Sequence, residues 1–310
     1  MYYPYFRGKQ YELITIRENA EMIARNNIVP VIEPVRSSFS GLRRAIEALH
    51  AADANFVLIL NPQVGDLAKN SEWLDLESCM EFLSGYTNCS IGFIANATVS
   101  NVDIFRLQEY PFPVSVIHNG CTRARDLLEL LSPLDNLREH IFIEESCSRL
   151  YRRQFNGIQR ILVRDGFIKR TNRKHPSREH FSDLHVTYHD EGVDGFGDFL
   201  IVGDDYSETG GPAYAVAIHL TYIDEDEDDD MFLNHYVSDR QLDPTDPGGK
   251  FLEALNKLHR DINNGNFHQT GAVREFMDLH SRQHFPGLGY VKKLSMQHHV
   301  EVIAKFLTSN

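Results

Sequence analysis

Eight short hydrophobic runs follow one another along this chain, and nearly all of them end at a polar residue. Runs rich in Val, Ile and Leu that are bounded by turns are typical of strands buried on both faces, as in a parallel sheet covered by helices. The runs end at Glu33, Asn61, Asn96, His118, Glu144, Arg164, Asp204 and His219. Because the carboxyl ends of such strands share one edge, the sequence predicts a polar rim at which any chemistry would take place.

Helical periodicity fills most of the gaps between the early runs. Apolar residues recur at helical spacing in four of these stretches, which are Leu13 to Ile23, Leu42 to Leu49, Leu76 to Leu83 and Leu127 to Leu131. Alternation of strands and helices favours an α/β fold with a parallel sheet. After Glu144 this rhythm breaks, and residues 165–200 show no clean helical period.

We therefore expect an irregular TIM-barrel-like (β/α) barrel that forms a single domain over residues 1–310. Regular β/α units occupy 1–165, an irregular loop-rich β part occupies 166–240, and C-terminal helices occupy 241–310. Only Ser207–Pro212 separates the run that ends at Asp204 from the next run. A connection this short predicts a hairpin between those two runs, because a parallel crossover needs a dozen or more residues. Asp246-Pro247 predicts the start of the first C-terminal helix.

Composition limits the class of protein and of partner. The chain has 310 residues, 42% hydrophobic content and a formal net charge of -13. This acidity disfavours duplex nucleic acid as a partner. No apolar stretch reaches the length of a membrane span, the first residues lack the layout of a signal peptide, and the four cysteines form no metal-binding spacing, so a cytoplasmic protein without a membrane partner is expected.

The polar rim offers candidate catalytic residues. Glu33, Glu144 and Asp204 could bind Mg²⁺ or Mn²⁺ through carboxylate oxygens, and together with His118 they could carry metal-assisted or acid-base catalysis on a phosphate ester. Strand-end carboxylates also cap helices or pair with arginine, and that structural role stays open for each of them.

A basic segment from Arg149 to Arg178 contains ten cations and one acid. Arginine forks suit oxyanions, so Arg164 and Arg170 are candidate phosphate-binding residues. The alternative is a basic surface that meets the chain's own acidic run, Asp224 to Asp230, or an acidic partner; the acidic run itself is expected to be a solvated loop.

Three further residues are candidates for substrate binding. Arg7 and Lys9 stand just before the first helix and could fold over an open rim. His185 precedes a glycine-rich bend at residues 192–197, where the backbone could approach a ligand closely, although a bend that merely turns the chain is an alternative.

Several segments of the sequence resemble those of a known group of proteins. The segments MYYPYFRGKQYELITIRE, PVIEPV, LILNPQVGD, VIHNG, LVRDGFIKRTNRKHP, FSDLHVTYHDEGVDGFGDFLIVGDDYSETGGPAYAVAIHLTYID, HYVSDR, PTDPGGKF and HFPGLGYVKKLSMQHHVE resemble an uncharacterised bacterial family that is distantly similar to the beta-protein group of phages and bacteria. The resemblance implies a barrel-like fold. It also implies that the gene for this protein lies beside one particular uncharacterised gene, in genomic surroundings like those of defence genes. It implies no catalytic residues.

The leading functional hypothesis is a hydrolytic barrel enzyme that acts on a nucleotide or phosphodiester in bacterial antiviral defence or stress. The alternative, from another class, is a non-catalytic barrel that binds the protein encoded by its neighbouring gene. A peptide- or nucleotide-sensing module is a third possibility.

Overall fold

The computed structural model describes residues 1–69, 73–74, 76–208, 210–264 and 267–309, without the side chains of 76–79. Where the sequence predicts a single domain, these residues group into two compact units. The first unit contains residues 1–165 and 187–199, and the second contains 166–186 and 200–310. The second unit therefore receives one segment inserted between two parts of the first.

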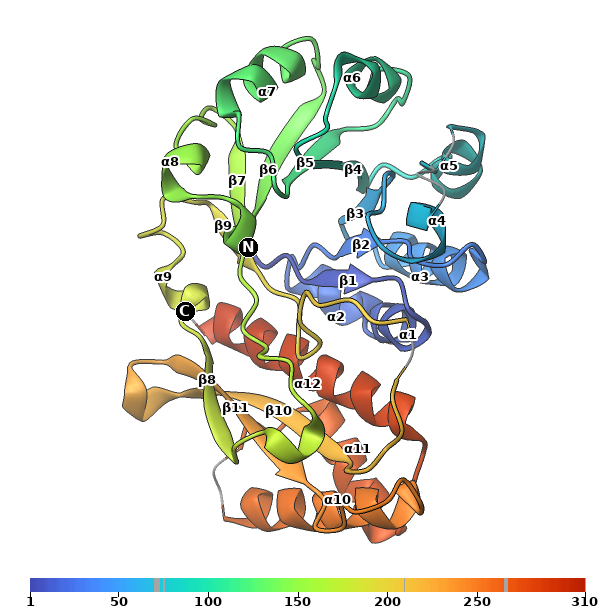
Figure 1. Cartoon of the computed structure of the whole chain (residues 1–310), viewed down its shortest axis with the longest axis vertical. Coiled ribbons are helices and arrows are strands. Elements are labelled where there is room, and N and C mark those ends of the chain that lie inside the picture. Colours follow the sequence, from blue (N-terminus) through green and yellow to red (C-terminus); the bar gives the residue numbers. More distant parts are fainter. Residues whose placement is uncertain (70–72, 75, 209, 265–266, 310) are drawn as a thin grey trace. The chain divides into compact units, whose positions relative to one another are not determined.

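The first unit is the predicted α/β barrel. Eight parallel strands follow one another in a single sheet: β1 (Tyr5–Arg7), β2 (Val31–Glu33), β3 (Phe56–Ile59), β4 (Cys89–Ala95), β5 (Val114–His118), β6 (Leu137–Ile143), β7 (Gln159–Val163) and β9 (Gly195–Gly197) (Figure 1). Backbone N–H groups of Tyr3 and Tyr5 donate to the carbonyl oxygens of Phe196 and Asp198, and these bonds join β9 to the first strand. The prediction of a barrel-like fold is confirmed.

Helices fill the gaps between the early strands, as the periodicity predicts. They are α1 (Gln10–Glu18), α2 (Ala20–Arg25), α3 (Ser40–Ala51), α4 (Gly65–Lys69), α5 (Leu76–Leu83), α6 (Asn101–Leu107), α7 (Ala124–Leu131) and α8 (Arg149–Arg152), with a 3-10 turn η1 (Glu144–Ser146). The interior of the barrel is an apolar cluster drawn from alternate strand positions, such as Val57 and Ile59 on β3 or Ile141 and Ile143 on β6. Residues of the opposite parity face the helices.

The last barrel strand differs from the one that the sequence predicts. The apolar run that starts at Phe199 is not a strand, and Leu200 within it adopts a left-handed backbone with φ of 53°. The last strand of the barrel is instead β9, in which Phe196 lies between two glycines. Glycine suits this position because the backbone of Gly197 lies against that of Tyr3, with no room for a side chain. The expected hairpin between the last two runs is therefore absent.

The second unit contains an antiparallel sheet in the order β10 (Ala217–Asp224), β11 (Asp230–Val237) and β8 (Arg178–Ser182). A hairpin forms between β10 and β11, and its turn is the acidic run, which contains the 3-10 turn η3 (Glu225–Glu227). The acidic run is largely exposed, as expected of a solvated loop. Asp228 and Asp229 adopt left-handed conformations in the turn, which aspartate tolerates better than most residues. Two short elements, η2 (Asn172–Lys174) and α9 (Leu184–Thr187), flank β8.

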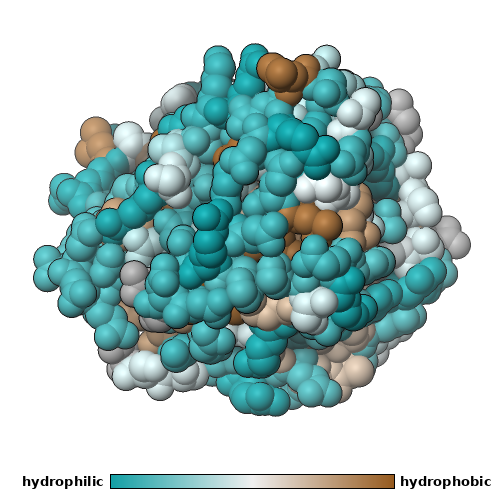
Figure 2. Space-filling model, turned by 90° about the horizontal axis from the view of Figure 1, so that it is seen from below, coloured by the Kyte–Doolittle hydropathy of each residue, from teal (hydrophilic) through white to brown (hydrophobic). Residues whose placement is uncertain are grey.

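Three helices complete the second unit: α10 (Pro247–Asn263), α11 (Gly271–Ser281) and α12 (Leu288–Ser309). The predicted start of the first is confirmed, since the Asp246 carboxylate accepts a hydrogen bond from Gly249 N at 2.9 Å. Apolar side chains of all three helices pack against Ile218 and Leu220 of β10. The face seen from the side of α10 is accordingly mostly hydrophilic (Figure 2).

Among the described residues, no helix is both long and apolar enough to span a bilayer.

Replacement of Gly197 by alanine is expected to destabilise the barrel by about 1–3 kcal/mol, because the added Cβ would overlap the carbonyl oxygen of Tyr3 where the ring of strands is joined. Urea unfolding measures the change. Gly211→Ala is the matched control, since a Cβ at Gly211 meets nothing within 4 Å. Equal unfolding midpoints for the two variants would contradict the packing that we describe at this joint.

Candidate functional site

Glu33 lies at the carboxyl end of β2 and is buried, as a strand-end residue that points into the barrel. Its carboxylate forms an ion pair with Arg7, with Nε and Oε2 3.0 Å apart. The hydroxyl of Tyr5 donates to it at 2.8 Å and the backbone N–H of Gln63 donates at 2.7 Å. The Arg7 guanidinium lies over the rings of Tyr5 and Phe199. Glu33, a predicted catalytic residue, and Arg7, a predicted substrate-binding residue, thus bind each other.

A cavity of about 410 Å³ opens at this same edge, beyond the ends of β1 and β2. Its lining contains Arg17, Arg36 and Arg44 with a single carboxylate, that of Asp66. Two helices begin at its wall: Gln10 is the first residue of α1, and Ser40 is the first residue of α3. The N-cap residues are Lys9 and Phe39, and neither helix has a capping hydrogen bond from a side chain. Helix N-termini carry partial positive charge, so the cavity favours an anion.

A smaller hollow of about 220 Å³ lies at the ends of β3 and β4. Asn61 and Asn96, two of the strand-end residues, line it with Gln63 and Asp103. The Asn61 side chain is already engaged with the backbone of Ile94, since it donates to the carbonyl at 2.9 Å and accepts from the N–H at 2.8 Å. Both of these hollows lie at the carboxyl edge of the barrel.

His118 ends β5 but points away from the barrel interior, because Ile117 beside it belongs to the interior cluster. Its imidazole is fully buried, 2.8 Å from the hydroxyl of Tyr151 and 2.9 Å from Nδ1 of His140. The ring of Phe155 packs on it. Burial lowers the pKa of His118 well below its usual value. The structure thus places His118 among packed aromatic rings, apart from Glu33.

Glu144 follows β6 and lies in a network of arginines at the carboxyl edge. Its carboxylate oxygens are 2.5 Å from Nε and 3.1 Å from Nη2 of Arg164, and a second arginine, Arg152, lies 3.8 Å away. Arg152 also binds Glu191 at 2.7 Å, and Arg149 binds the same carboxylate through two nitrogens. The structural alternative for Glu144, a pair with arginine, is what this geometry shows.

The remaining predicted residues of the site, apart from Lys9, belong to the second unit. Arg170 binds both carboxylate oxygens of Glu179 at 2.6–2.7 Å. His185 is buried, with Nε2 2.9 Å from the carbonyl oxygen of Asp229. Asp204 is partly buried in the loop that leads toward β10. The structure therefore brings Glu33 and Arg7 together, and Glu144 and Arg164 together, but it does not assemble all the predicted residues into one group.

Six of the ten cations in the basic segment form ion pairs with the chain's own carboxylates; these are Arg149, Arg152, Arg164, Lys169, Arg170 and Arg178. Arg178 reaches the acidic run itself, at Asp224 and Glu227. This pattern agrees with the alternative that the basic segment pairs with acidic residues of the same chain. A phosphate contact by Arg164 or Arg170 stays a prediction.

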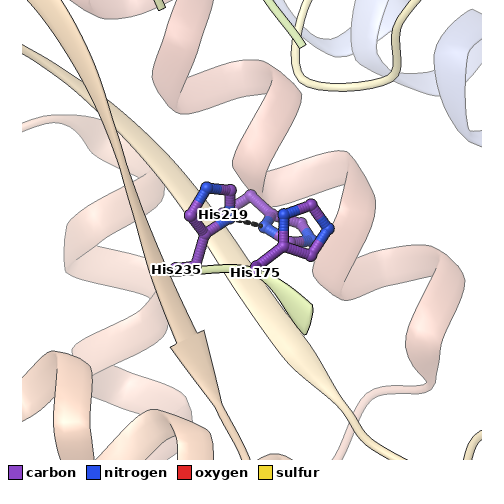
Figure 3. Close-up of side chains that lie close together, drawn as sticks. All are labelled: His175, His219 and His235. Atoms are coloured by element: carbon purple, nitrogen blue, oxygen red, sulfur yellow. Dashed lines mark hydrogen bonds between the residues drawn. The ribbon is translucent and has the colours of Figure 1, made fainter. Parts of the chain in front are cut away.

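A cluster of three histidines in the second unit was not identified as a site from the sequence. His219 on β10 faces His235 on β11, with their Nδ1 atoms 2.6 Å apart, and His175 lies beside them after η2 (Figure 3). The His175 and His235 rings stack with centroids 4.3 Å apart. Burial lowers the pKa of His235 to about 4 and that of His219 well below its usual value.

One signal in the sequence could have found two of these residues. His219 and His235 are each eight positions from Glu227, the middle of the acidic run. A hairpin centred on that run pairs them directly across the two strands, and the register of β10 with β11 does so. No comparable signal identifies His175, which arrives from a separate segment.

Compared with family models, with curated proteins and with solved structures, the chain shows no match in any of the three. The resemblance to the bacterial family stays a prediction, and function has to be inferred from the geometry of these residues.

Proposed function

We propose that the barrel unit binds a phosphate-bearing small molecule in the cavity at the ends of β1 and β2. The observation that carries the proposal is the charge of the lining, in which three arginines face one carboxylate. Arg44 forms no ion pair among the described residues, and Arg17 pairs only with its exposed neighbour Glu18 at 3.2 Å. Guanidinium groups bind phosphate oxygens through paired N–H donors.

The backbone supports the same ligand. The first turns of α1 and α3 adjoin the cavity without side-chain caps, and serine hydroxyls at Ser37, Ser38 and Ser40 add neutral donors. A phosphate that accepts N–H bonds from a helix N-terminus also interacts favourably with the helix dipole. The cavity stands at the carboxyl edge of a parallel barrel, where barrel enzymes keep their sites.

The chemistry performed on that ligand stays a prediction. A hydrolytic reaction assisted by Mg²⁺ or Mn²⁺ would draw on Glu33, Glu144 and Asp204, and the first two of these carboxylates are held by arginines. A role in bacterial antiviral defence and a partner encoded by the neighbouring gene rest on the sequence alone. Binding is therefore the property to test first.

Calorimetric titration with inorganic phosphate, pyrophosphate and nucleoside phosphates tests the proposal. We expect pyrophosphate or a nucleoside phosphate to bind, and Arg44→Gln to weaken that binding by about tenfold or more, because a hydrogen bond to a charged group contributes about 1.5–3 kcal/mol. The matched control is Arg25→Gln, an exposed arginine at the end of α2, near the opposite end of the strands.

Equal affinities for Arg44→Gln and Arg25→Gln would place the ligand outside this cavity. If none of the phosphate compounds binds the wild-type protein, the proposal fails and the alternative of a barrel that binds a partner protein gains.

A further inference from the structure

In the part of the chain that the structure describes, His175, His219 and His235 are the one group of three metal-ligating side chains whose ligand atoms lie together. One nitrogen from each ring lies within 4.8 Å of the others. Tetrahedral zinc with Zn–N bonds of about 2.0–2.1 Å holds two ligand nitrogens about 3.3 Å apart. The facing Nδ1 atoms of His219 and His235 would separate by less than about 1 Å to reach that spacing.

His175 contributes an unsatisfied donor or acceptor. Its Nδ1 is buried and makes no hydrogen bond to any described residue, and its side chain is only 1% exposed. The closest carboxylate oxygen, Oε1 of Glu179, is 3.6 Å away, which is too long for a hydrogen bond. Buried polar atoms nearly always have a partner, so an orphaned imidazole nitrogen beside two others points to a ligand that the three share.

The surroundings of His235 match those of a metal ligand. Its Nδ1 faces His219, while its other nitrogen, Nε2, lies 2.8 Å from Oε1 of Glu179. Arg170 in turn binds both oxygens of that carboxylate. Histidines that bind metals commonly donate their second N–H to a carboxylate, which fixes the ring and the tautomer that leaves the first nitrogen free for the ion.

We propose that His175, His219 and His235 bind one divalent transition-metal ion of the zinc type, and that Glu179 positions His235 for it. Imidazole nitrogens suit Zn²⁺ and the ions of copper, iron and nickel, whereas Mg²⁺ and Mn²⁺ prefer oxygen ligands. This histidine site would therefore select other metals than the carboxylate site predicted from the sequence. The proposal is independent of the phosphate cavity, whose residues belong to the other unit.

The three histidines leave the fourth position of a tetrahedral ion for a water molecule, and the burial of His175 and His235 favours a stabilising role for the ion over a catalytic one. The side chains of His175 and His235 are 1% and 0% exposed. The ion would join the inserted segment 166–186 to the hairpin of β10 and β11 and so stabilise the second unit. Because the lone pair of an imidazole lies in the plane of its ring, His175 has to turn from its stacked position on His235 to point its Nδ1 at the ion.

Metal titration of the chelator-treated full-length protein tests the proposal. We expect one equivalent of Zn²⁺ to be retained through dialysis and to raise the melting temperature, and Mg²⁺ at the same concentration to do neither. Co²⁺ in the site should show the strong visible absorption of a four-coordinate ion. His219→Asn should lose the bound zinc, and His180→Asn, which alters an exposed histidine on β8, should retain it.

The variant Glu179→Gln tests whether Glu179 positions His235 for the metal ion or only lies beside it. This variant should still bind one zinc ion, but about 10- to 100-fold more weakly, because the carboxylate no longer orients His235. Unchanged affinity would overturn the role of Glu179.

The site itself is overturned if the wild type retains no more zinc than His219→Asn. Should His219→Asn fail to fold, the cobalt spectrum of the wild type decides: weak absorption typical of six-coordinate cobalt would reject the histidine site.

Discussion

Replacing Arg7 by methionine is expected to lower the free energy of unfolding by about 3–5 kcal/mol. The substitution leaves the Glu33 carboxylate, which is 2% exposed, without its cation inside the barrel. The two remaining donors, the Tyr5 hydroxyl and the Gln63 N–H, satisfy its oxygens but do not neutralise its charge. Urea unfolding at neutral pH measures the loss.

The double variant Arg7→Met/Glu33→Gln is the decisive comparison. A neutral amide oxygen can still accept a hydrogen bond from Tyr5 or Gln63, so most of the lost stability should return even though two native residues are gone. Arg123→Met removes an exposed ion pair with Asp126 and should cost less than about 1 kcal/mol. If the double variant is no more stable than Arg7→Met, the buried charge is not the cause of the loss.

Mild acid is expected to destabilise the barrel unit through His140, whose pKa is lowered to about 4 by burial and, to a lesser extent, by the charge of Arg160. In the unfolded chain a histidine has a pKa of about 6.5. Between these values the unfolded state binds a proton that the folded state does not, so stability falls as pH falls. The contribution is present above pH of about 6.5, and its loss on acidification to about pH 4 amounts to about 3 kcal/mol.

Unfolding curves at a series of pH values between 7 and 4.5 test this linkage. His140→Gln should reduce the slope of stability against pH by about 1.4 kcal/mol per pH unit in the middle of that window. His118 beside it, also buried, maintains part of the acid sensitivity. His189→Gln, which replaces an exposed histidine, is the control. Identical slopes for wild type and His140→Gln would contradict a neutral buried imidazole.

Much of the barrel could be predicted from local patterns. Apolar runs of strand length, separated by stripes at helical spacing, predict β/α units, because each element must bury its own apolar face wherever it lies in the fold. The same reasoning predicts α10 and its start at Asp246-Pro247. The residues that end the runs from Glu33 to Arg164 lie at one edge for a similar reason, since parallel strands all finish on the same side.

The direction of the side chains at that edge could not be read from the sequence. Glu33 and His118 both end apolar runs, yet Glu33 points into the barrel and His118 points toward Tyr151. The difference is one residue of strand register, and a shift of one residue moves a side chain to the other face. Where both faces of a strand are apolar, the sequence pattern does not specify which face a terminal residue takes.

The last barrel strand and the histidine cluster depend on contacts between distant segments. The glycine-containing β9 replaces the more apolar run beside it because only its backbone fits against Tyr3, a residue almost two hundred positions away. His175 meets His219 and His235 only because segment 166–186 leaves the barrel to join another sheet. The sequence by itself determined most of the strands and helices up to Glu144, since burial of each face is a local property. Which of them pair, and so which polar side chains meet, was decided by the tertiary structure, because strand pairing depends on backbone fit between residues far apart in the chain.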